Sequence, residues 1–224
     1  MTIATTAPPT PTPTQQRALL TLPIALVVAV GAGTALGVLD LAWNAERPSV
    51  WSAAANSCAV WAASAYAVGV LLAARLRIGP VAGALAGVLM LVVAVEAYYL
   101  AGIHWLGNDR SVLTSASTQT WLQLSVLVGS VLGAAGVWAV RGSWFAASLA
   151  TAACAAMFFG DALQVWAYRP PGAWPGIEHV LVILGALVLV ASVRRPAVAA
   201  TAAVLFLPLS VVVALAFLTT GMAA

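Results

Sequence analysis

Three carboxylic acids stand at similar depth in three apolar segments of this sequence. Asp40, Glu96 and Asp161 each lie near one end of a predicted helix, and more apolar residues follow Glu96 and Asp161 before any loop begins. An ionisable side chain at membrane depth is costly, so it is a candidate for function. Burial in an apolar pocket raises the pKa of a carboxylic acid, and such an acid can donate a proton near neutral pH. The three acids therefore predict proton-transfer chemistry.

Aromatic and polar side chains accompany the acids, because residues three or four positions apart share one face of a helix. We predict that the acids act as catalytic groups and that the neighbouring residues bind substrate; these are Trp43, Tyr98, Tyr99, Phe158, Gln164 and Tyr168. Aromatic rings stabilise a desolvated cation by roughly 0.5–2 kcal/mol each. The alternative is an aromatic belt, since Trp and Tyr collect at membrane interfaces. The other three acids, Glu46, Asp109 and Glu178, lie in predicted loops and are expected to be solvated.

The elements that must position these residues are membrane-spanning helices. The chain of 224 residues is 63% hydrophobic and 7% charged, whereas soluble domains carry about 25% charged residues. Seven apolar segments approach the roughly 20 residues needed to cross a bilayer: 19–43, 57–74, 79–103, 121–140, 143–168, 177–193 and 196–218. The sequence thus predicts an all-α, polytopic membrane helical bundle. Residues 18–220 form its seven-helix transmembrane domain, and the Thr/Pro-rich residues 1–17 form a disordered cytoplasmic tail.

The distribution of basic residues predicts the orientation of the bundle. All nine basic residues are arginines, and six of them fall on one side of the predicted spans: Arg17, Arg75, Arg77, Arg141, Arg194 and Arg195. Because cytoplasmic loops are enriched in basic residues, we expect a multi-pass protein of the cell membrane with a cytoplasmic N-terminus. All six acids then lie toward the outer end. No basic cluster is long enough to bind a nucleic-acid backbone, so no nucleic-acid partner is expected.

Two patterns predict how the helices pair. The segment from Trp61 to Gly69 matches the segment from Trp121 to Gly129, and each is followed by an arginine turn and a helix that carries an acid. This indicates a helical-hairpin repeat, or alternatively chance similarity between Ala-, Val- and Leu-rich helices. Small residues four apart allow helices to approach closely. We therefore expect two pairs to face into the bundle, Gly33 with Gly37 and Gly129 with Gly133.

Several catalytic motifs are missing from the sequence. It contains no glycine-rich phosphate loop, no GxSxG nucleophile elbow, no HExxH pair and no Asp-rich DDxxD run. Its two cysteines, Cys58 and Cys154, both lie in apolar segments and have no metal-ligand spacing. We therefore predict chemistry that uses neither a metal nor another cofactor.

Two stretches resemble small actinobacterial integral membrane proteins of unknown function: AsnSerCysAlaValTrp at 56–61 and GluAlaTyrTyrLeuAlaGly at 96–102. That resemblance implies no activity. The arrangement of acids among aromatic residues is also loosely similar to the small membrane-bound terpene cyclases of meroterpenoid pathways in secondary metabolism (the drimentine type). No motif aligns with those enzymes, so no residue role is transferred by position.

The cyclase resemblance implies proton-initiated cyclisation of a hydrophobic, farnesylated small molecule that reaches the protein through the lipid bilayer. A prenyltransferase of the same pathway is the expected partner. In this interpretation Asp161 or Glu96 protonates the substrate, and Asp40 orients it or takes the final proton. Two alternatives stay open, a proton-coupled small-molecule transporter and a non-catalytic membrane protein.

Overall fold

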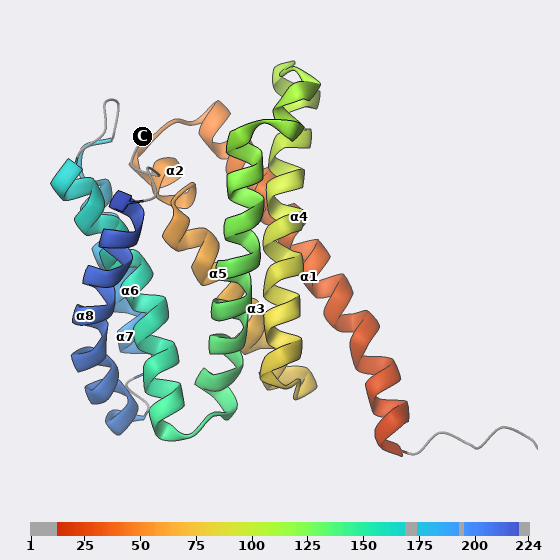
Figure 1. Ribbon diagram of the computed structural model, residues 1–224, viewed down its shortest axis with the longest axis vertical. Helices are drawn as coiled ribbons and strands as arrows, with labels where there is room; N and C mark the ends of the chain where they lie inside the picture. Colours follow the sequence, from red (N-terminus) through yellow and green to blue (C-terminus); the bar gives the residue numbers. More distant parts are fainter. Residues whose placement is uncertain (1–12, 169–173, 193–194, 220–224) are drawn as a thin grey trace, which may run out of the picture.

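The computed structural model describes residues 13–168, 174–192 and 195–219, which form a bundle of antiparallel helices (Figure 1). The main helices are α1 (Pro13–Glu46), α3 (Cys58–Leu76), α4 (Pro80–Leu106), α5 (Ala116–Arg141), α6 (Trp144–Tyr168), α7 (Ile177–Ala191) and α8 (Pro196–Thr219). The short helix α2 (Val50–Ala55) follows α1, and the 3-10 helix η1 (Arg110–Thr114) joins α4 to α5. The described residues contain no β-strand.

The prediction of a helical membrane bundle is confirmed. Six of the described helices are long and apolar enough to cross a bilayer, namely α1, α3, α4, α5, α6 and α8. Helix α7 is apolar but has only 15 residues. It begins at the predicted residue 177 and ends at Ala191, while residues 193–194 lie outside the description. The chain is therefore a multi-pass membrane protein.

Helix starts differ most from the sequence prediction where polar residues occupy the first turn. Helix α5 begins at Ala116 instead of residue 121, because the Ser115 side chain caps the helix by accepting a hydrogen bond from the backbone N–H of Thr118. Helix α1 begins at Pro13, inside the segment predicted as a tail, and proline suits a first turn because its missing N–H would have no helical partner there. The remainder of that predicted tail, residues 1–12, lies outside the described part of the chain.

Glycines set the closest helix contacts. A Cβ added to Gly129 would meet the backbone of Gly87, and one added to Gly133 would meet the carbonyl oxygen of Gly83. The other side of α5 lies equally close to α3, where Gly136 faces the backbone of Tyr66. Helix α5 is therefore wedged between α3 and α4, and we call this contact the glycine seam. On α1 the predicted glycine pair, Gly33 and Gly37, likewise faces the α4 backbone. The packing prediction is confirmed for both pairs.

The bundle has two chemically different ends. Consecutive main helices run in opposite directions (Figure 1), so residues that are distant in the sequence gather at the same end. We call the end that holds α2 and η1 the acidic end; Asp40, Glu46, Asp109, Asp161 and Glu178 lie toward it. The opposite, arginine end holds Arg75, Arg77, Arg141 and Arg195. There Arg141 donates hydrogen bonds to the carbonyls of Arg77 and Ile78, just beyond the last turn of α3. Arginine therefore satisfies carbonyls left free at a helix end.

Candidate functional site

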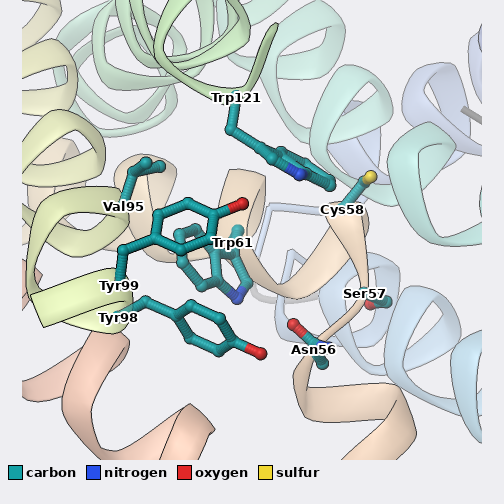
Figure 2. Close-up of a pocket in the computed structure, with 8 residues that line it drawn as sticks. All are labelled: Asn56, Ser57, Cys58, Trp61, Val95, Tyr98, Tyr99 and Trp121. Carbon is teal, nitrogen blue, oxygen red and sulfur yellow. The ribbon is translucent and has the colours of Figure 1, made fainter. Parts of the chain in front are cut away.

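A cavity of about 160 Å³ opens between α3, α4 and α5 at the acidic end (Figure 2). We call it the aromatic pocket, and its lining residues are Asn56, Ser57, Cys58, Trp61, Val95, Tyr98, Tyr99 and Trp121. Three of its rings pack edge to face: the ring centroids of Trp61 and Tyr98 are 6.2 Å apart, and those of Tyr98 and Tyr99 are 5.5 Å apart. The pocket wall is thus largely made of π-electron faces and edges.

The pocket lies in the half of the bundle where glycines no longer allow the backbones of α3, α4 and α5 to approach closely. The glycine seam holds α3, α4 and α5 together in the half toward the arginine end and ends at Gly129. Beyond it, Trp61 and Trp121 stand between the helices. A smaller cavity of about 40 Å³ shares Cys58 and both tryptophans and continues toward Met157 on α6. Small residues at one end and bulky ones at the other therefore create the opening.

Asp40 on α1 lies directly behind the pocket wall. Its side chain is only 3% exposed. Its Oδ2 accepts a hydrogen bond of 3.1 Å from the indole Nε1–H of Trp61, and its Oδ1 accepts one of 3.0 Å from the side-chain amide of Asn44. Asp40 therefore fixes the orientation of a lining tryptophan, although it does not itself line the cavity.

Asp161 on α6 reaches the wall from the other side. This side chain is 7% exposed, and its Oδ2 accepts a hydrogen bond of 3.4 Å from the backbone N–H of Ala59 in the first turn of α3. The side chain of Ser57, the N-cap of α3, lies close to this carboxylate. A carboxylate is favourable beside the free N–H groups of a helix N-terminus. Because Ser57 and Cys58 at the start of α3 line the pocket, Asp161 lies directly behind them.

The structure brings together only part of the predicted site. Tyr98 and Tyr99 line the pocket, whereas Glu96 is half-buried and does not line it. Glu96 has the pocket-lining Tyr99 on one side of it on α4 and Leu100, which is 52% exposed, on the other. Trp43 is 46% exposed and also lies outside the pocket.

The predicted residues on α6 are also separate from the pocket. Phe158 is buried in the core, where its Cβ lies against Gly185 of α7. Gln164 is buried but does not line the pocket. The side chain of Tyr168 lies outside the described part of the chain. Phe158 is therefore a packing residue, because it faces α7 and not the space between α3, α4 and α5.

Sequence reasoning missed both tryptophans of the pocket as site residues, although a signal for them existed. Trp61 and Trp121 occupy equivalent places in the two copies of the predicted repeat, and the structure places both against the same cavity. Ser57 and Cys58 were missed because their role depends on where α3 begins. A residue at the first turn of a helix faces a neighbour only once the helices are packed.

The loop acids have local roles. Oδ1 of Asp109 accepts a hydrogen bond of 2.7 Å from the backbone N–H of Ser111, and hydrogen bonds from Ser111 lower the pKa of this exposed carboxyl. Oε1 of Glu178 lies 3.6 Å from Nδ1 of His179, and the Glu178 side chain is largely buried, unlike the solvated acid that was predicted. Among the described residues, no three His, Cys, Asp or Glu side chains are grouped as a metal site.

Comparison with known proteins identifies the family. Residues 16–222 match the model of a family of unknown function, DUF6518. The chain belongs to this family. No curated protein and no solved structure matches it. The predicted resemblance to proteins of unknown function is confirmed at this level, while the actinobacterial and terpene-cyclase resemblances stay predictions.

Proposed function

We propose that this protein cyclises a prenylated small molecule inside the membrane, with the aromatic pocket as its active site. The observation that carries the proposal is the pairing of aromatic walls with buried acids. Asp40 is hydrogen-bonded to the lining residue Trp61, and Asp161 lies close to the lining residue Ser57. Cyclisation of a polyprenyl chain needs both features, a proton source and π faces that stabilise carbocations.

The size of the pocket suits the reacting end of such a substrate. Pockets that enclose a drug-sized ligand usually measure about 300–1,000 Å³, and this one measures about 160 Å³. The terminal isoprene units would occupy it, extending toward Met157 through the smaller cavity. The remainder of the substrate would stay in the surrounding lipid, into which it partitions by its apolar surface.

Asp161 is the proposed proton source, and Ser57 is the group that contacts the substrate. After the Ser57 hydroxyl turns toward the pocket, it passes its proton to the terminal alkene carbon and receives one from Asp161. The electron pair of an internal alkene then forms a ring bond to the cationic carbon. Loss of a proton from a neighbouring C–H gives a new alkene, and this proton returns to the Asp161 carboxylate through the Ser57 hydroxyl. The product is an isomer with the mass of the substrate.

One observation favours a second candidate, a proton-coupled carrier of a small molecule. In the structure both buried acids accept hydrogen bonds, Asp40 from Trp61 and Asp161 from Ala59. Protonation of Asp161 would weaken its interaction with the N-terminus of α3. That change would couple proton binding to movement of one pocket wall, as a carrier requires.

Membranes that contain the full chain, incubated with a farnesylated indole and no added metal, test the proposal. Mass spectrometry and NMR should detect a cyclised product of unchanged mass, and Asp161→Asn should abolish its formation while expression persists. The control is Glu46→Gln, which alters an exposed acid at the same end and should leave turnover unchanged. Normal cyclisation by Asp161→Asn would contradict the acid assignment. Absence of product from wild type, with uptake driven by a pH gradient, would establish the carrier instead.

A further inference from the structure

A second cavity, unrelated to the aromatic pocket, lies at the arginine end. It measures about 390 Å³ and lies between α3, α5, α6, α7 and α8. Most of its walls are aliphatic, with Val70, Val140, Val188 and Val198 among the lining residues. Tyr66 and Thr151 also line it, and the Thr151 hydroxyl donates a hydrogen bond of 2.9 Å to the carbonyl oxygen of Ala147. Most of this wall therefore offers no partner to a polar ligand.

The aliphatic part of this space is unsuited to water. Protein interiors are packed as densely as organic crystals and contain few voids, and cavities with apolar walls stay dry. A hydrocarbon chain fills an aliphatic space without leaving polar groups unpaired. The surrounding membrane supplies such chains at high concentration, so lipid is the natural source of an occupant.

The rim of this cavity carries positive charge. Arg195 is exposed and lines the cavity immediately before the first turn of α8. Among the described residues, one of its five N–H donors is committed, to the carbonyl oxygen of Ala139 at 3.4 Å. The six Asp and Glu side chains lie in the other half of the bundle or near its middle, so none of these six balances this guanidinium. The N-terminus of α8 adds a partial positive charge at the same place.

We propose that this cavity binds one anionic phospholipid, with its phosphate at Arg195 and one acyl chain between the valines. Basic pockets between transmembrane helices are known places for anionic lipid head groups. Here the charge and the apolar volume are adjacent, which matches the two halves of a lipid. A free anion would use only the rim, and a neutral lipid would use only the cavity.

Titration of the purified full-length protein with phosphatidylglycerol or phosphatidylcholine, followed by native mass spectrometry, tests this site. We expect one phosphatidylglycerol to bind more tightly than phosphatidylcholine. A basic residue near a membrane surface contributes about 1 kcal/mol, so Arg195→Gln should weaken phosphatidylglycerol binding about fivefold. Val188→Phe should weaken binding of both lipids, because the ring occupies the cavity.

Two matched variants and a soluble competitor complete the test. Leu187→Phe enlarges an exposed neighbour on α7, and Arg110→Gln removes an arginine at the acidic end; both should bind phosphatidylglycerol like wild type. Inorganic phosphate should not displace the lipid. Unchanged binding in both Arg195→Gln and Val188→Phe would overturn the site, and displacement by inorganic phosphate alone would show a simple anion site in place of a lipid site.

Discussion

The indole N–H of Trp61 lies 3.1 Å from Oδ2 of Asp40, and this hydrogen bond joins α3 to α1 beside the aromatic pocket. Asn44 holds the other carboxylate oxygen of Asp40. The same tryptophan packs edge to face against Tyr98 on α4. One buried acid thus determines the position of a ring that three helices share.

This contact should be measurable as a coupling energy. Hydrogen bonds between side chains in membrane proteins contribute about 0.6 kcal/mol on average and up to about 1.7 kcal/mol. A double-mutant cycle of Asp40→Ala and Trp61→Phe should give a coupling within this range, measured by unfolding in mixed detergent micelles. Trp166 is exposed on α6, so a cycle of Asp40→Ala with Trp166→Phe should give no coupling. Equal coupling in both cycles would show that the bond contributes nothing specific.

The glycine seam predicts a large effect from a single methyl group. Gly133→Ala should destabilise the protein by about 1–3 kcal/mol. The added Cβ would overlap the α4 backbone, so α4 and α5 would have to move apart. Gly31 on α1 has no atom within 4 Å of an added Cβ, so Gly31→Ala is the matched control. This control should be neutral or stabilising by up to about 1 kcal/mol, since alanine favours helix. Equal melting temperatures for the two variants would contradict the seam.

The structure changes which substitutions should affect the proposed cyclisation. Glu96→Gln should retain turnover, because Glu96 does not line the pocket. Trp121→Ala should alter the product mixture, because the loss of a π face changes which cation is favoured. Phe158→Ala should instead lower stability by about 3–5 kcal/mol, as for other buried phenylalanines. Product analysis by mass spectrometry, together with thermal unfolding, separates these outcomes.

The orientation in the membrane is a separate prediction from the placement of the arginines. With the native cysteines replaced, a cysteine at Asn108 should react with a membrane-impermeant maleimide in intact cells, and one at Leu76 should react only after lysis. The reason is that basic loops stay in the cytoplasm. Labelling of position 76 in intact cells would reverse the orientation. Labelling of both positions in intact cells would indicate that the cells had lysed. A cytoplasmic marker protein that also becomes labelled would show this lysis.

Hydropathy was enough to predict the helices, but the composition of the pocket depends on packing. Apolar length predicted α3 and α4 to within about three residues, because hydrocarbon thickness fixes the length of a span. It could not show that Glu96 and Asp161, which are alike in sequence, face different surroundings. Asp161 meets the first turn of α3, whereas Glu96 lies on the face of α4 that carries the exposed Leu100.

The glycines explain why local sequence patterns predicted the helix packing in one half of the bundle but not in the other. A pair such as Gly129 and Gly133 leaves only one good arrangement, close backbone contact, so its spacing predicts its surroundings. Trp61 and Trp121 are large, and each has several possible neighbours. Their convergence on one cavity follows from the angle between α3, α4 and α5, which no single segment encodes.

The short helix α7 has a consequence for the membrane itself. Its 15 residues span about 22 Å, whereas the hydrocarbon layer is about 30 Å thick. Ile183, Leu187 and Val190 on this helix are exposed, so lipid contacts it directly. Such hydrophobic mismatch is relieved when the bilayer thins locally or neighbouring lipids tilt. If α7 crosses the bilayer, we expect this flank of the protein to favour short-chain lipids, so that the thickness of the host membrane acts on the bundle through α7.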